Sequence, residues 1–127
     1  MNDTRMQKQF ATRPEVETDP ALTIFEQFQN ETLRPILKQQ NEVLIRIFRQ
    51  YIIKHKDAFR KMSIKEKETY IKTSLRQDQH FRNFVRGIVA GLFTEEEWDI
   101  YINNEDELSK RMINLIEQRL TSQVKDL

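Results

Sequence analysis

The sequence predicts an all-α fold, a single-domain bundle of about five helices that follows a flexible polar N-terminal arm. Three observations support this class. Apolar residues recur at steps of three and four over most of the chain, which is the period of an amphipathic helix. Signals for helix starts stand between these apolar stripes. Only two glycines and three prolines are present, so the turn residues that β-hairpins require are scarce.

The chain has 127 residues, a length that fits one domain with one hydrophobic core. We assign residues 1–20 to the arm and residues 21–127 to the helical domain. The arm is polar, carries two prolines and shows no apolar periodicity, so we expect it to be flexible. The alternative is that this segment folds onto a partner.

The first helices are expected in the N-terminal half of the helical domain. Pro20 suits the first position of a short helix over the apolar cluster that follows it. Pro35 suits the first turn of a new helix that begins near residues 32–33. Apolar residues then recur at three- and four-residue steps from Leu33 to Ile52, with Gln40 and His55 on the same stripe, which predicts one long helix that ends at about residues 56–60.

Two capping boxes predict two further helix starts. Ser63 with Glu66, and Thr94 with Glu97, have the spacing at which each side chain accepts a hydrogen bond from the backbone N–H of the other residue. Both boxes precede apolar residues at helical spacing. Each box is a structural signal and carries no chemistry of its own.

Asp78 is a favourable N-cap for a helix between these boxes. This helix contains the most apolar run of the chain, so we expect it at the centre of the fold. The spacing of Gly87 and Gly91 predicts a close contact with a neighbouring helix, and Asn104 is expected to cap the last helix. The predicted core residues are Leu37, Leu44, Ile47, Phe48, Tyr51, Ile71, Phe84, Val85, Ile88, Leu92, Trp98, Met112 and Ile116.

The composition argues against several classes of chemistry. The chain has no cysteine, which removes disulfides, thiolate nucleophiles and thiolate metal sites. It has two histidines, too few for a three-histidine metal site in one chain. Glu-x-x-His pairs and glycine-rich phosphate-binding motifs do not occur. We therefore predict no catalytic, cofactor-binding or metal-binding residues. The sequence also shows no signal peptide and no apolar run of about 18 residues, so we expect a cytoplasmic location without a membrane span.

Charge is unevenly distributed along the chain, although the net charge is only +1. Residues 34–86 hold fourteen Lys and Arg against five Asp and Glu, a net charge of +9. Residues 1–33 and 87–127 carry net charges of −3 and −5. We call residues 34–86 the basic segment. Its candidate binding residues are Arg46, Arg49, Lys54, Lys56, Arg60 and Lys61.

These features favour a non-enzymatic interaction protein, an adaptor or a regulatory subunit with a protein partner. An alternative is association with nucleic acid, in ribosomes or the transcription machinery, because Lys and Arg neutralise phosphates. A third reading is that the basic residues pair with the acidic C-terminal helices. The apolar stripe of the first long helix also leaves self-association open, since it serves either as core or as a dimer interface.

A family resemblance rests mainly on residues 81–98, which read F-R-N-F-V-R-G-I-V-A-G-L-F-T-E-E-E-W. With residues 30–37 and 108–112, this region resembles a family of small, functionally uncharacterised bacterial proteins of Bacteroidota. The resemblance covers about residues 30–124 and implies a compact helical domain. Members are sometimes labelled glyoxalase, which makes an enzyme the third functional hypothesis. The metal-ligand sets of glyoxalases do not occur in this chain, so no catalytic residue is carried over.

Overall fold

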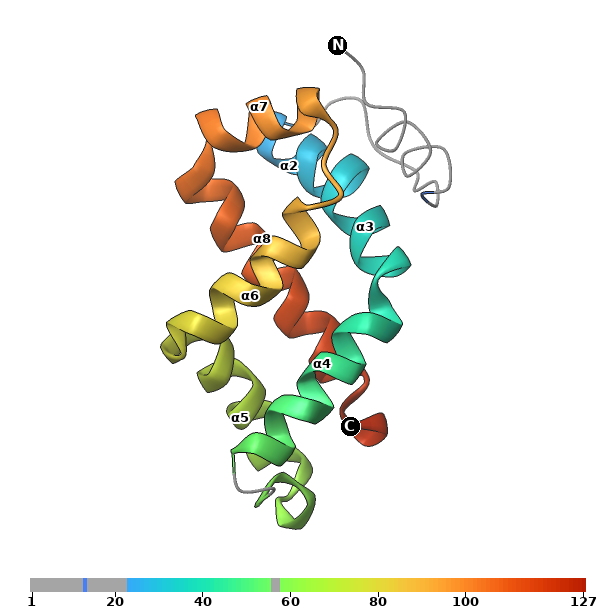
Figure 1. Ribbon diagram of the computed structural model, residues 1–127, viewed down its shortest axis with the longest axis vertical. Helices are drawn as coiled ribbons and strands as arrows, with labels where there is room; N and C mark the ends of the chain where they lie inside the picture. The colour runs from blue at the N-terminus through green and yellow to red at the C-terminus, as the bar shows by residue number, and fades with distance from the viewer. Residues whose placement is uncertain (1–12, 14–22, 56–57) are drawn as a thin grey trace.

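The computed structural model describes Arg13, residues 23–55 and residues 58–127 (Figure 1). Most of the predicted arm, the helix start at Pro20 and the candidate Lys56 lie outside these residues. Over the described residues the chain is helical and has no strand, which confirms the all-α class. The elements are α2 (Ile24–Phe28), the π-helical turn η1 (Gln29–Leu33), α3 (Arg34–Gln39), α4 (Asn41–Lys54), the 3-10 turn η2 (Ala58–Lys61), α5 (Ile64–Gln77), α6 (Gln79–Ala90), α7 (Glu95–Asn103), α8 (Glu105–Ser122) and the 3-10 turn η3 (Val124–Asp126).

Helix α8 is the centre of the bundle. It contacts each of the helices α2 to α7, and Figure 1 shows it passing behind α6 along the length of the molecule. Its buried stripe includes Leu108, Met112, Ile116 and Leu120, which recur every four residues. None of the described helices is long and apolar enough to cross a membrane.

Helix α6 does not lie at the centre, so that prediction is wrong. Its apolar residues lie on more than one face, and only Phe81, Val85 and Val89 are buried. Phe84 is 57% exposed, although we predicted it as core. Trp98 on α7 is also wrongly predicted, since it is 44% exposed. Burial follows the face on which an apolar residue lies and not the mean apolarity of its segment.

The other predicted core residues are buried or partly buried. Ile47, Tyr51 and Leu92 are partly buried hydrophobic residues packed against the core, and Ile88 has intermediate exposure. The fully buried members form one cluster in which rings and aliphatic chains from several helices meet. The predicted residues that are buried are Leu37, Leu44, Phe48, Ile71, Val85, Met112 and Ile116.

The predicted long helix is divided in two. Helices α2 and α3 are joined through η1 without interruption, so no new helix begins at residues 32–33. Gln40 then ends α3 with φ −94° and ψ 11°, and α4 begins at Asn41 and ends earlier than predicted, at Lys54. The side-chain amide of Asn41 donates to Oε1 of Gln123 at 2.9 Å and accepts from its Nε2 at 2.7 Å. This reciprocal pair holds the break against the end of α8.

The capping predictions at three helix starts are confirmed. Ser63 and Thr94 accept hydrogen bonds from the backbone N–H of Glu66 and Glu97 at 3.2 and 3.1 Å, and both boxes are complete. Asp78 accepts from the backbone N–H at the third position of α6 at 3.1 Å. These caps fix where α5, α6 and α7 begin.

Two predictions from local motifs are wrong in part or in full. Asn104 is the N-cap residue of α8, as predicted, but its side chain makes no capping hydrogen bond, and its Nδ2 donates to the carbonyl of Ile100 at 2.9 Å and closes α7. The close helix contact expected at Gly87 and Gly91 is also missing from the part of the chain that the structure describes. A Cβ at Gly87 would meet nothing within 4 Å, and one at Gly91 would meet only carbonyls of its own helix.

Phe48 and Phe84 provide a matched pair of substitutions, because the Phe48 ring is fully buried among aromatic neighbours and the Phe84 ring is largely exposed. We expect Phe48→Ala to lower the free energy of unfolding by about 3–5 kcal/mol, since it opens a cavity in the core. Phe84→Ala should cost less than about 1 kcal/mol. Urea unfolding followed by circular dichroism measures both values, and equal losses would contradict this assignment of the core.

Candidate anion-binding site

A pocket of about 520 Å³ lies between the end of α5, one face of α6 and the first half of α8. We call it the basic pocket, because four of its lining side chains are cations. The remaining lining residues supply a hydroxyl, an amide and two apolar side chains. The lining residues are Leu75, Arg76, Arg82, Arg86, Ser109, Lys110, Ile113 and Asn114.

The break between α5 and α6 brings Arg76 and Arg82 together. Asp78 is the C-cap residue of α5 and the N-cap of α6, so the chain changes direction between the two arginines. Nη1 of Arg82 donates to the carbonyl of Arg76 at 2.9 Å. Carbonyls in the last turn of a helix lack helical partners, so this hydrogen bond closes the end of α5.

Arg86 stands one turn after Arg82 on the same face of α6. Its Nη2 donates to the hydroxyl of Tyr101 at 2.9 Å and to Oγ of Ser109 at 3.0 Å, and these two hydroxyls are 2.6 Å apart. Tyr101 comes from α7 and Ser109 from α8, so three helices fix one guanidinium group. Nε of Arg86 is buried and has no hydrogen-bond partner among the described residues.

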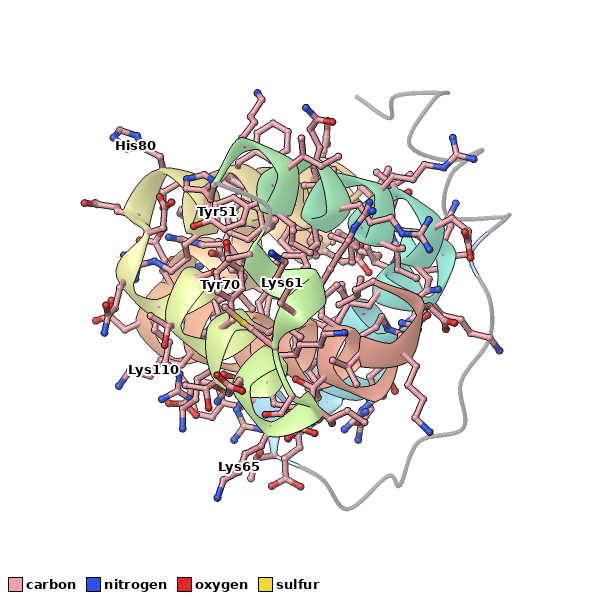
Figure 2. All side chains as sticks on the ribbon, turned by 90° about the horizontal axis from the view of Figure 1, so that it is seen from below. Tyr51, Lys61, Lys65, Tyr70, His80 and Lys110 are labelled. Carbon is pink, nitrogen blue, oxygen red and sulfur yellow. The ribbon has the colours of Figure 1, made fainter. Side chains whose placement is uncertain are left out.

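The positive charge of the pocket is only partly neutralised. Oε1 of Glu117 lies 3.5 Å from Nε of Arg76, and Oε2 of Glu105 lies 3.7 Å from Nη2 of Arg86. Arg82 and Lys110 form no ion pair within the described residues, and Figure 2 shows Lys110 projecting outward. Four cations therefore face two carboxylates, and a bound anion would reduce the repulsion among them.

The basic-segment candidates lie elsewhere. Arg46, Arg49 and Lys54 are exposed on α4, and Arg60 and Lys61 are exposed on η2. None of the five lines the basic pocket. Arg49 donates through Nε, at 3.1 Å, and through Nη2 to the carbonyl of Asp126, so it holds the C-terminal turn. Their role in binding stays a prediction.

The pocket arginines belong to the basic segment, but sequence reasoning did not select them. The spacing of Arg82 and Arg86, one helical turn apart just after an N-cap, was a usable signal. Lys110 had no such signal, since it comes from the acidic C-terminal part of the chain.

A second recess, of about 680 Å³, contains both histidines. The Tyr51 hydroxyl donates to Oδ2 of Asp78 at 2.8 Å, and the ring of His55 stacks on that of Tyr51 with centroids 4.0 Å apart. Figure 2 shows Tyr51 near Tyr70, whereas His80 projects away from them. The hydroxyl of Ser74 lies in this recess but donates to the carbonyl of Tyr70 at 2.8 Å, so it is bound to its own helix.

The two central groups of this recess have shifted pKa values. Burial, and then the hydrogen bond to Asp78, raise the pKa of Tyr51 to about 12. The backbone N–H of Phe81, and then the Tyr51 hydroxyl, lower the pKa of Asp78. The described residues contain no cluster of three or more His, Asp or Glu side chains that could hold a metal ion. No Lys or Arg side chain is among the described residues that line this recess, whereas four cationic side chains line the basic pocket.

Comparison of the chain with protein-family models gives no match, and comparison with curated proteins and solved structures gives no significant match. The resemblance to the Bacteroidota family therefore stays a prediction. A functional proposal for this chain has to rest on the geometry of its described residues.

The raised pKa of Tyr51 predicts a loss of stability at high pH. The Tyr51 hydroxyl ionises less readily in the folded protein than in the unfolded chain. The stabilisation that its neutral form provides is therefore complete below the ordinary pKa of 10.0 and is lost as the pH rises toward the folded-state pKa of about 12. We expect the difference in free energy of unfolding between the wild type and Tyr51→Phe to shrink between about pH 9 and about pH 11. Urea unfolding at both pH values measures it, and a constant difference would contradict the shift.

Proposed function

We propose that this protein is a non-enzymatic interaction protein that binds an anionic segment of a partner protein in the basic pocket. The observation that carries the proposal is the convergence of Arg76, Arg82, Arg86 and Lys110 on one pocket with two carboxylates in ion-pair range. Guanidinium groups bind carboxylates and phosphates through paired hydrogen bonds, and such charge-assisted bonds are stronger than neutral ones.

The fixed position of Arg86 supports a binding role. Its guanidinium is already held by Tyr101 and Ser109, so little of its conformational freedom remains to be lost when an anion binds. Its buried Nε has no partner among the described residues and leaves one donor unsatisfied.

The residues that line the pocket favour an acidic or phosphorylated side chain over a nucleic acid. Leu75 and Ile113 add apolar surface beside the cations, which suits the hydrocarbon part of a side chain. Proteins that bind single-stranded nucleic acid present a charged groove with stacking aromatic residues. No aromatic side chain of the described residues lines this pocket. A protein partner therefore fits the pocket better than single-stranded RNA or DNA does.

The proposal is tested with two variants that remove the same charge. Arg82→Gln with Lys110→Gln removes two cations from the pocket, and Arg46→Gln with Lys54→Gln removes two exposed cations from α4. The probe is a short fluorescein-labelled peptide with one phosphoserine among glutamates, followed by fluorescence anisotropy. We expect the pocket variant to bind at least about tenfold more weakly, or about 1.4 kcal/mol, and the α4 variant to bind within about twofold of the wild type.

Two outcomes would contradict the proposal. Equal losses in both variants would mean that the peptide responds to overall charge. Salt-sensitive binding of RNA that is lost only in the α4 variant would favour the nucleic-acid alternative at Arg46 and Lys54. Circular dichroism of each variant shows whether its helices are intact, so a folding defect is distinguished from a binding defect.

A further inference from the structure

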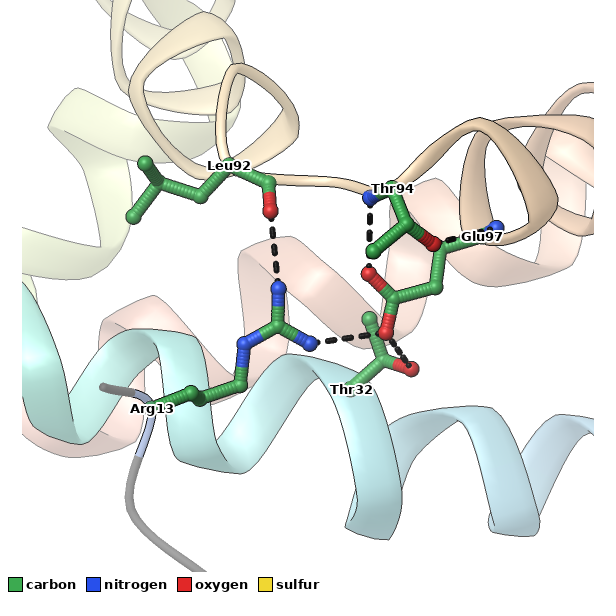
Figure 3. A network of polar contacts seen from close by, with 5 residues as sticks. All are labelled: Arg13, Thr32, Leu92, Thr94 and Glu97. Atoms are coloured by element: carbon green, nitrogen blue, oxygen red, sulfur yellow. Dashed lines mark hydrogen bonds and ion pairs between the residues drawn. The ribbon is translucent and has the colours of Figure 1, made fainter. Parts of the chain in front are cut away.

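A second polar site lies at the start of α7 and is separate from the basic pocket (Figure 3). Glu97 is buried there, and its Oε2 accepts from Nη1 of Arg13 at 2.7 Å and from Oγ1 of Thr32 at 2.9 Å. Its Oε1 accepts from the backbone N–H of Thr94 at 2.9 Å. Nη2 of Arg13 donates to the carbonyl of Leu92 at 2.7 Å. The side chains of Arg13 and Glu97 are only 3% and 11% exposed.

The acceptors of this site are held by the helical body, independently of Arg13. The capping box fixes Glu97 through Thr94, and Thr32 donates to it from η1. The carbonyl of Leu92 lies in the turn after α6, next to Phe93, which is buried in the core. Oε2 of Glu97 and the carbonyl oxygen of Leu92 are therefore held at a spacing that the two terminal nitrogens of one guanidinium can bridge.

This geometry selects an arginine. A buried carboxylate is unfavourable unless a cation and hydrogen bonds compensate it, so the site requires a positive group. The guanidinium is planar and presents donors in a fixed fork, whereas a lysine ammonium is a compact point charge. Arg13 reaches both acceptors at 2.7 Å, which matches the fork. The site therefore has the chemistry of an arginine receptor.

We propose that Thr32, Leu92 and Glu97 form an arginine-recognition site, filled by Arg13 of the same chain, which also accepts an arginine from an extended segment of a partner protein. The exchange replaces one guanidinium by another at the same acceptor oxygens. Arg13 acts as a tethered competitor, so the affinity of the empty site for a partner is multiplied by the fraction of time that Arg13 leaves the site empty. This proposal does not depend on the basic pocket.

The test uses the full chain with Arg13→Ala, which empties the site. The probe is a dye-labelled peptide of about nine residues that carries one arginine in a sequence unrelated to the chain's own arm, and its control carries citrulline, a neutral isostere, in place of the arginine. We expect the arginine peptide to bind this variant and the citrulline peptide to bind at least about tenfold more weakly, because the charge is lost. The wild type should bind the arginine peptide at least about tenfold more weakly than Arg13→Ala does.

Glu97→Gln in the Arg13→Ala background is the matched protein control, because Gln also completes a capping box but carries no charge. We expect this double variant to bind the arginine peptide no better than the citrulline peptide. If Arg13→Ala alone is unfolded, refolding by added arginine peptide, followed by circular dichroism, becomes the measurement. The proposal is overturned if the arginine peptide neither binds nor refolds Arg13→Ala, or if the citrulline peptide does so equally well.

Discussion

The burial of one face of α8 is the constraint on which the rest of this structure depends. Leu108, Met112 and Ile116 are completely buried, and each such side chain contributes roughly 1.5–3 kcal/mol when it leaves water. Because α2 to α7 all contact α8, the direction of this helix sets where their polar faces meet. Ser109 and Lys110 directly follow the first buried leucine, and they lie on the side of α8 that faces α6. The basic pocket is therefore a consequence of how the core is packed.

Helix α7 connects the two polar sites of the molecule. Glu97 near its start receives Arg13, and Tyr101 one turn later receives Arg86. The ring of Tyr101 also packs on Phe93, with centroids 5.3 Å apart, which anchors the helix in the core. One short capped helix thus positions an acceptor for a guanidinium at its first turn and a hydroxyl for the basic pocket at its second. Both sites therefore depend on the same helix, which is held by its capping box and by the packing of Tyr101 on Phe93.

The sequence predicted those parts of the fold that are encoded within a few neighbouring residues. The caps at Ser63, Asp78 and Thr94 depend on groups three residues away, and all three are as expected. The break at Gln40 could not be predicted in this way, because the amide pair that holds it joins Asn41 to a residue 82 positions later. The net charge of the basic segment is a sum over residues that lie on several different surfaces of the fold, so it does not locate a site. The segment contained the three pocket arginines, but it could not indicate that Lys110 completes their site.

Arg13 shows most clearly why the candidate sites were only partly predictable. The arm around it was expected to be flexible on composition, yet this one side chain is buried against a residue 84 positions away. Glu97 was predicted as half of a capping box, and that role uses only one of its two carboxylate oxygens. The second oxygen is buried with it, and burying an ionised carboxylate is unfavourable without a cation. A buried capping glutamate therefore requires a positive partner from elsewhere in the chain, and the chemistry of its pocket determines that this partner is an arginine.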